Sequence, residues 1–210
     1  MRTTFCFLAI VFSTFCFAQK EFQPIGSAII DSIDGDLDGD KIHEKVIVYD
    51  TKDTTDMGTV REIQVLKKKG GKWSILEKSR NVILESKGGG MMGDPYQSIE
   101  IKKGILLITQ AGGSSWKWGY TDKYRFQNGH FELIGYDSSY GKPEEYFTDI
   151  EYNLSTGLLT FSKEVENTGE YGESKKEAFI KKGLKINFQN RNQKEQRAIR
   201  LPKTQETIYL

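Results

Sequence analysis

Acidic side chains recur at alternate positions in one short stretch, and this spacing suits a hard cation. The carboxylates are Asp36, Asp38, Asp40 and Glu44, at relative positions 1, 3, 5 and 9. A tight loop turns alternate side chains inward, and Ca²⁺ takes about six to eight oxygen ligands. Ile42, at position 7, can offer its carbonyl oxygen. We therefore expect these five residues to bind one Ca²⁺ with a structural role; the alternative is a solvated acidic turn without metal.

Two registers of this stretch match known calcium loops. The register that starts at Asp34 has Gly39 in sixth place, as in an EF-hand, but it puts Lys45 where that loop needs a bidentate glutamate. The β-branched residues that follow favour a strand over the required helix. The register that starts at Asp36 resembles the calcium loops of FG-GAP and VCBS-type repeats, which lead into a strand. Lys41 departs from that pattern, because glycine is usual there.

The first 18 residues have the pattern of a secretory signal peptide. A basic Arg2 precedes an apolar run, and the small residues Cys16 and Ala18 precede the expected cleavage point. The apolar run is too short to span a bilayer as a mature helix. We therefore expect residues 19–210 to form a single β-rich domain, secreted or periplasmic, with no transmembrane segment.

Cysteine usage and charge narrow the function classes. Both cysteines, Cys6 and Cys16, lie in the segment that we expect to be removed, so the mature chain would have no disulfide and no cysteine ligand. Such a chain depends on its core, to which a bound ion would add stability. The 30 basic residues nearly balance the 29 acidic ones, and this balance argues against a nucleic-acid partner.

The clearest strand runs over residues 116–126, where every second side chain is aromatic except Asp122. Period-two alternation gives one aromatic and one polar face. Asn128-Gly129 then predicts a type I′ hairpin turn. The predicted cross-strand pairs are Phe126 with Phe131, Arg125 with Glu132, and Tyr124 with Leu133.

Short alternating segments separated by turns continue along the chain. Strands are predicted at 45–49, 61–66, 73–76, 98–102, 105–109, 147–153 and 158–163. A further hairpin is predicted from 178–180 and 184–188 around Lys182-Gly183, and a polar loop at 137–145. The pattern predicts an all-β fold, an antiparallel sandwich, barrel or partial propeller built from hairpins.

A longer stretch resembles a family of exported bacterial proteins of unknown function. The likeness is carried by residues 88–95, 99–101, Gly104, 112–118 and 133–135. The resemblance implies secretion and a β fold and brings no catalytic residues. Within it, the glycine-rich residues 88–95 are either a loop at a binding face or a crowded crossover where only glycine fits.

No motif selects catalytic residues, because His43 and His130 belong to no known metal or nucleophile pattern. A recognition or scaffold role with a protein or glycan ligand is the first hypothesis. The alternative is a carbohydrate-binding or carbohydrate-active protein that uses Trp116, Trp118 and Tyr120. The first predicts that both tryptophans are buried beside Phe126 and Phe131; the second predicts an exposed aromatic platform near a carboxylate pair.

Overall fold

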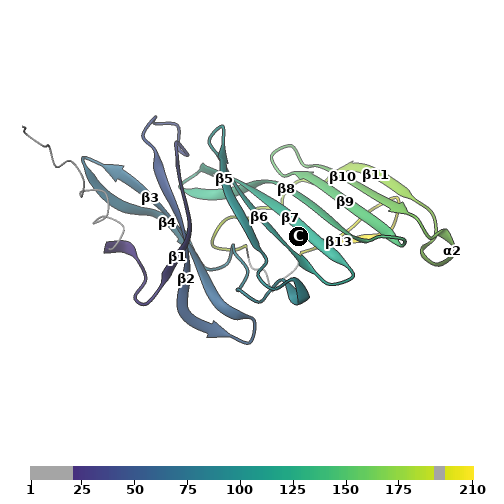
Figure 1. The fold of residues 1–210 in the computed structure, drawn as a ribbon. Helices are drawn as coiled ribbons and strands as arrows, with labels where there is room; N and C mark the ends of the chain where they lie inside the picture. Colours follow the sequence, from purple (N-terminus) through teal and green to yellow (C-terminus); the bar gives the residue numbers. More distant parts are fainter. Residues whose placement is uncertain (1–20, 192–196) are drawn as a thin grey trace, which may run out of the picture.

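The computed structural model describes residues 21–191 and 197–210, whose regular secondary structure consists almost entirely of antiparallel strands (Figure 1). The expected signal peptide, residues 1–18, lies outside the described residues. The first sheet has the order β1 (Ala28–Gly35), β2 (Glu44–Thr55), β3 (Gly58–Lys69) and β4 (Lys72–Ser79). In the described ranges, no helix combines the length and apolar character that crossing a membrane requires.

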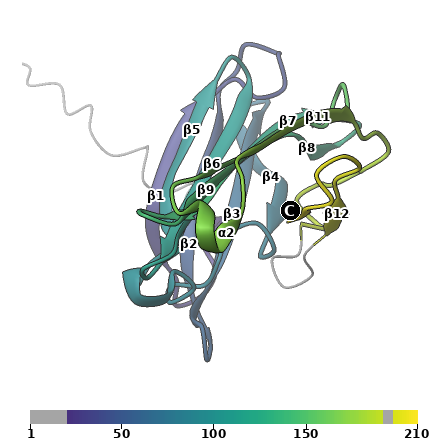
Figure 2. The ribbon, with the colours of Figure 1, turned by 90° about the vertical axis from the view of Figure 1, so that its right-hand side faces the viewer.

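The second sheet is larger and also follows chain order. Its strands are β5 (Tyr96–Lys102), β6 (Ile105–Gly113), β7 (Lys117–Gln127), β8 (His130–Lys142), β9 (Tyr146–Asn153), β10 (Leu158–Val165) and β11 (Lys175–Ile180). The short helices η1 (Gly90–Met92) and α2 (Thr168–Tyr171) precede β5 and β11. A last hairpin, β12 (Ala198–Arg200) and β13 (Thr207–Tyr209), lies beside one face of this sheet (Figure 2).

The β7–β8 hairpin forms as predicted. Asn128 and Gly129 have φ angles of 54° and 81°, the left-handed backbone that a type I′ turn requires. All three predicted cross-strand pairs occur. Because Lys123 pairs with Gly135 and Tyr124 with Leu133, Ile134 is an extra residue, a β-bulge. The bulge changes which β8 positions share a face, so that Tyr136 follows Leu133 on the inner side.

Apolar side chains from both sheets form the core. Val48 and Ile63 of the first sheet and Tyr124 and Phe131 of the second are fully buried in one cluster. Phe188 joins them, with its ring centroid 4.8 Å from that of Tyr124 and 5.0 Å from that of Phe131. The all-β expectation is confirmed, and two open sheets around a common core correspond to the sandwich among the three predicted architectures.

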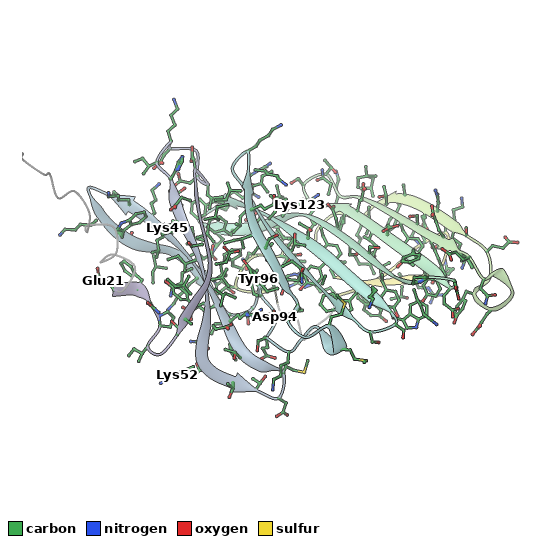
Figure 3. The ribbon with its side chains drawn as sticks, in the orientation of Figure 1. Glu21, Lys45, Lys52, Asp94, Tyr96 and Lys123 are labelled. Atoms are coloured by element: carbon green, nitrogen blue, oxygen red, sulfur yellow. The ribbon has the colours of Figure 1, made fainter. Side chains whose placement is uncertain are left out.

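The two sheets approach each other at β1 and β5. The Tyr96 hydroxyl donates to Asp31 Oδ2 over 2.6 Å, and Tyr96 lies where the sheets cross in Figure 3. Gly35 lacks the side chain that would collide with Ile101, because a Cβ there would lie 2.8 Å from Ile101 Cδ1. This glycine therefore allows close packing of the two sheet edges.

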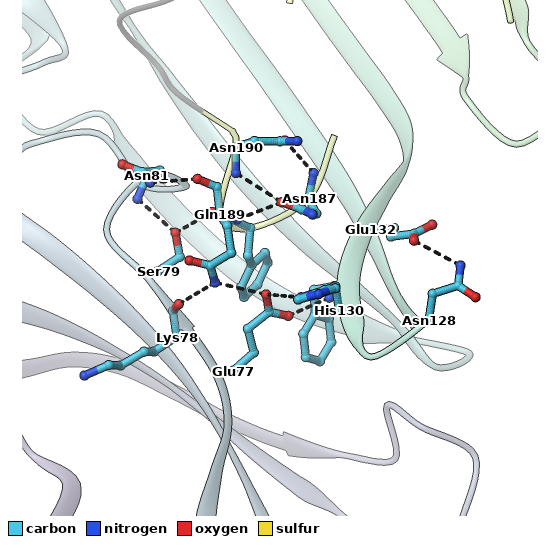
Figure 4. A network of polar contacts seen from close by, with 12 residues as sticks. Glu77, Lys78, Ser79, Asn81, Asn128, His130, Glu132, Asn187, Gln189 and Asn190 are labelled. Carbon is cyan, nitrogen blue, oxygen red and sulfur yellow. Dashed lines mark hydrogen bonds and ion pairs between the residues drawn. The ribbon is translucent and has the colours of Figure 1, made fainter. Parts of the chain in front are cut away.

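A polar network joins β4 to the start of β8 through the segment that contains Gln189 (Figure 4). The buried Glu77 accepts the Phe131 amide at 2.6 Å through Oε2 and the Gln189 side-chain amide at 3.0 Å through Oε1. Ser79 Oγ donates to the Phe188 carbonyl over 2.6 Å. These bonds satisfy polar groups at the edge of the core and fix Phe188 between the sheets.

Two segment predictions were wrong. Residues 184–188 do not form a hairpin with 178–180, because β11 pairs with β10 and residues 184–188 instead place Ile186 and Phe188 in the core. Residues 137–142 continue β8 rather than forming a loop, and they pair with both β7 and β9. Their polar side chains misled the prediction, because this part of the sheet is not covered by the first sheet.

The glycine-rich segment crosses β6 at Gly112. The Gly113 amide donates to the Gly89 carbonyl over 2.8 Å. A Cβ on Gly112 would lie 2.7 Å from Gly89 Cα and 2.5 Å from Trp118 Cζ2. Only glycine fits this approach, so the crowded-crossover reading accounts for the glycines at the crossing.

Candidate functional site

The acidic loop connects β1 to β2. Gly35 pairs with Glu44 at its base, so the intervening residues form the hairpin connection. Carboxylate oxygens of Asp36, Asp38 and Asp40 all lie within 4.8 Å of one another. The structure thus brings together three of the five predicted ligands. Ile42 is half exposed on the same loop, and its amide donates to Asp40 Oδ1 over 2.8 Å.

The loop backbone folds around its first carboxylate. Asp36 accepts the amides of Gly39 at 2.7 Å and Lys41 at 3.0 Å. Lys41 has a φ of 66°, the left-handed conformation that glycine adopts freely. This is the position where FG-GAP and VCBS-type loops usually have glycine, so the lysine adopts the backbone conformation that glycine favours.

Lys67, from β3, reaches into the acidic cluster. Its ammonium donates to Asp38 Oδ2 and lies 2.7 Å from Asp40 Oδ2. The bond to Asp38, followed by that to Asp40, raises the pKa of Lys67. The bond from Lys67 is in turn the main reason that the pKa of Asp40 is lowered. Lys67 thus supplies one positive charge to a cluster of three carboxylates.

Glu44 lies at the inner end of the loop and is fully buried. Its Oε2 accepts the Leu37 amide at 2.8 Å, whereas its Oε1 is buried without a hydrogen-bond partner. Burial raises the pKa of Glu44, and the nearby charges of Asp38 and Asp40 raise it further. Glu44 is not among the three converging carboxylates, but its charge interacts with those of Asp38 and Asp40. A buried polar atom without a partner is costly, and a cation would remove that cost.

The aromatic face of β7 divides into two parts. Tyr124 lies in the core, and Phe126 packs against the core. Trp118 lines a groove of about 580 Å³, and Tyr120 both lines this groove and packs against the core. The groove lies between the inner face of β7–β10 and the chain around β13, which Figures 1 and 2 show beside that face. The other aromatic residues that line it are Tyr136, Tyr140, Tyr146, Phe161 and Tyr209.

The prediction that Trp116 and Trp118 are buried beside Phe126 and Phe131 was wrong. Both tryptophans are only partly buried and lie outside the hydrophobic cluster. The alternation of faces was predicted correctly, but the core covers only part of the strand. Trp116 stacks on Tyr140, with ring centroids 5.3 Å apart and planes 10° apart, and its ring centroid lies 4.8 Å from that of Tyr146. It therefore supports two groove residues without lining the groove itself.

A buried ion pair marks the boundary between core and groove. Asp122 is fully buried and accepts Arg191 Nε at 3.0 Å and Nη2 at 3.2 Å. The Arg191 guanidinium lies 5.7 Å from the Tyr120 ring centroid and 5.6 Å from that of Tyr136. Asp122 was visible in the sequence as the exception to the aromatic alternation. Its partner, 69 residues away, carried no local signal.

A comparison with family models, curated proteins and solved structures found no match to this chain. The likeness of the acidic loop to FG-GAP and VCBS-type repeats, and of residues 88–135 to an exported family, therefore stays a prediction.

Proposed function

We propose that this chain is an exported β-domain with a recognition role and that Ca²⁺ bound by the loop 36–44 stabilises its fold. The observation that carries the calcium assignment is the convergence of Asp36, Asp38 and Asp40 within 4.8 Å of one another, supported by the buried, partnerless Oε1 of Glu44 at the base of the same loop. Lys67 provides a single positive charge there. A divalent cation offsets the remaining repulsion, and its preference for oxygen ligands fits the donor set, including the Ile42 carbonyl.

The role of the ion is structural. The loop feeds directly into β2, which contributes the fully buried Val46 and Val48 to the core. An ion that fixes the loop also fixes the start of this strand. Calcium is abundant outside cells, so even a site with a Kd of about 10⁻⁴–10⁻³ M is filled there.

The groove favours binding over hydrolysis. Glu206 is the one acidic side chain among the described residues that line it. Most glycoside hydrolases need two carboxyl groups that flank the scissile bond. The groove therefore fits a recognition role better than the hydrolytic form of the carbohydrate alternative.

Thermal melts of the mature chain in calcium and in chelator test the calcium assignment. Calcium at about 100 times Kd should stabilise the fold by roughly 2.7 kcal/mol, and the Asp38→Ala variant should lose that gain. Asp34→Ala is the matched control, because Asp34 pairs with Lys45 outside the converging cluster. Magnesium should substitute poorly, since it demands near-octahedral geometry. Equal melting temperatures of the wild type in calcium and chelator would refute the assignment.

A further inference from the structure

The groove between β7–β10 and the chain around β13 has the chemistry of a ligand site. We propose that it binds a neutral oligosaccharide. This inference rests on the proposed recognition role and names its ligand class. The carbohydrate hypothesis of the sequence used a flat platform of Trp116, Trp118 and Tyr120. The structure replaces this platform with a walled groove, to which Trp116 contributes only through its contacts with Tyr140 and Tyr146.

Ring faces on neighbouring strands provide the stacking surface. Trp118 and Tyr120, two residues apart on β7, have ring centroids 6.0 Å apart and planes 18° apart. Tyr140, the cross-strand neighbour of Trp118 on β8, is 41% exposed, whereas Tyr136 is buried beneath Arg191. Such rings accept the C–H face of a sugar, because the negative π face attracts slightly positive hydrogens. Several pyranose units in a row would therefore find successive apolar contacts along the groove.

The charged groups of the groove already have partners, so none selects an ionic ligand. Arg191 is held by Asp122. Lys163 lies 4.4 Å from the Tyr146 ring centroid, and its Nζ is 3.9 Å from Glu206 Oε1. An acidic ligand would have to compete with these carboxylates. A neutral ligand fits without separating either ion pair.

Hydroxyl groups line the same groove. Tyrosine side chains make up most of its aromatic wall, and Ser138 and Thr148 lie beside them. Each hydroxyl both donates and accepts hydrogen bonds, which matches the hydroxyl groups of a sugar. Tyr120 and Thr148 already bond to Gln110 and to the Tyr140 carbonyl, so we assign the sugar contacts to the exposed Tyr140 and Tyr209. Stacking surfaces combined with hydroxyls and balanced charges point to a neutral oligosaccharide.

Calorimetric titration of the mature chain tests this proposal. The probes are cellohexaose, xylohexaose, mannohexaose and chitohexaose, with polygalacturonate as the acidic counterpart and a proline-rich peptide as an aromatic-groove ligand of another class. The variants are Tyr140→Ala and Tyr209→Ala, whose side chains are 41% and 52% exposed, so their truncation should leave the fold intact. Ile180→Ala, on β11, is the control, because this side chain is 59% exposed and lies outside the groove lining.

At least one neutral hexasaccharide should bind, and each groove variant should weaken it by about tenfold or more while the control changes little. Binding of no neutral sugar, or binding that both groove variants leave unchanged, would overturn the proposal. Preferential binding of the peptide through Tyr140 would overturn the ligand class but keep the recognition role. The thermal melts in calcium and in chelator do not measure sugar binding, so they test the calcium assignment separately.

Discussion

Lys67 Nζ lies 2.7 Å from Asp40 Oδ2, so an ammonium group from β3 competes for oxygens that we assign to calcium. The same group also donates to Asp38. A cation that uses both carboxylates must displace this ammonium. In the metal-free loop, the Lys67 ammonium therefore acts as a counter-ion with a single charge, weaker than a divalent cation.

The Lys67→Met variant should bind calcium about tenfold more tightly, a gain of roughly 1.4 kcal/mol, because no ammonium has to leave. Its metal-free form should melt at a lower temperature than the wild type, since Asp38 and Asp40 lose their counter-charge. Calorimetric titration and melts in chelator measure the two effects. Lys45→Met, which removes a lysine paired with Asp34, should leave calcium affinity nearly unchanged. Equal calcium affinity of Lys67→Met and wild type would contradict the competition.

Replacing Lys41 with glycine should stabilise the fold by about 1 kcal/mol, because the lysine has a φ of 66°. Denaturant unfolding measures the gain. Lys103→Gly should behave similarly, since Lys103 has a φ of 52° in the turn between β5 and β6. Lys102→Gly, at the last residue of β5, should destabilise instead, because Lys102 does not have a positive φ. A loss of stability in Lys41→Gly would show that the lysine side chain matters more than its strained backbone.

Phe131→Ala should cost about 3–5 kcal/mol of unfolding free energy, because the ring is fully buried against Phe126 and Phe188. Trp118→Ala should cost distinctly less despite removing a larger side chain, since that ring lines the groove and stays partly exposed. Urea unfolding of the two variants compares them directly. A larger loss for Trp118→Ala would place this ring in the core after all.

Arg191→Met should destabilise the fold by about 3–5 kcal/mol, because it leaves the fully buried Asp122 without its ionic partner. The double variant Asp122→Leu/Arg191→Met should recover much of this loss, since no uncompensated charge remains. A double-mutant cycle completed with Asp122→Leu yields the coupling energy. Additive effects of the two substitutions would mean that the pair does not act as a unit.

Asp94 should make stability depend on pH in the acidic range. Both its oxygens accept bonds from the buried Arg61, each at 2.6 Å, and these bonds are the main cause of its lowered pKa. A carboxyl group whose pKa is lower when folded adds stability above its unfolded pKa and loses it as pH falls through the folded value.

The Asp94→Asn variant should therefore be less stable than the wild type near neutral pH, by about 1 kcal/mol or less because the carboxylate is half exposed. The difference should disappear at pH values below the folded pKa. Urea unfolding across this range measures it, with Asn at the exposed Asp56 as the control. A difference that persists at the lowest pH would assign the loss to packing rather than to charge.

Local patterns predicted the hairpins well. The register of Phe126 against Phe131 followed from period-two alternation and the Asn128-Gly129 turn, both of which act over a few residues. The all-β class followed from the same kind of signal. The structure of residues 184–188 could not be predicted in this way, because an apolar segment can either pair as a strand or fill a core. Only the position of Phe188 against Phe131 decides between these outcomes.

The candidate sites also contain residues that a local sequence pattern predicts and residues that only the fold brings together. Asp36, Asp38 and Asp40 converge because the loop itself holds them, and their spacing already indicated this. Lys67 and Arg191 reach their acidic partners from distant parts of the chain, so no motif could identify them. The groove was missed as a shape because the alternation of Trp118 and Tyr120 reveals a shared face but not what covers it.

The order of the strands also determines the expected order of folding steps. Each strand in the two large sheets pairs with its neighbour along the chain, so each pairing closes only a short loop. Short loop closures carry a low entropic cost and form early in folding. Phe188 and Arg191 come from a late segment that must cross to sheets already built before them. The docking of this segment is the expected slow step, and until it occurs Asp122 stays hydrated and the core stays open.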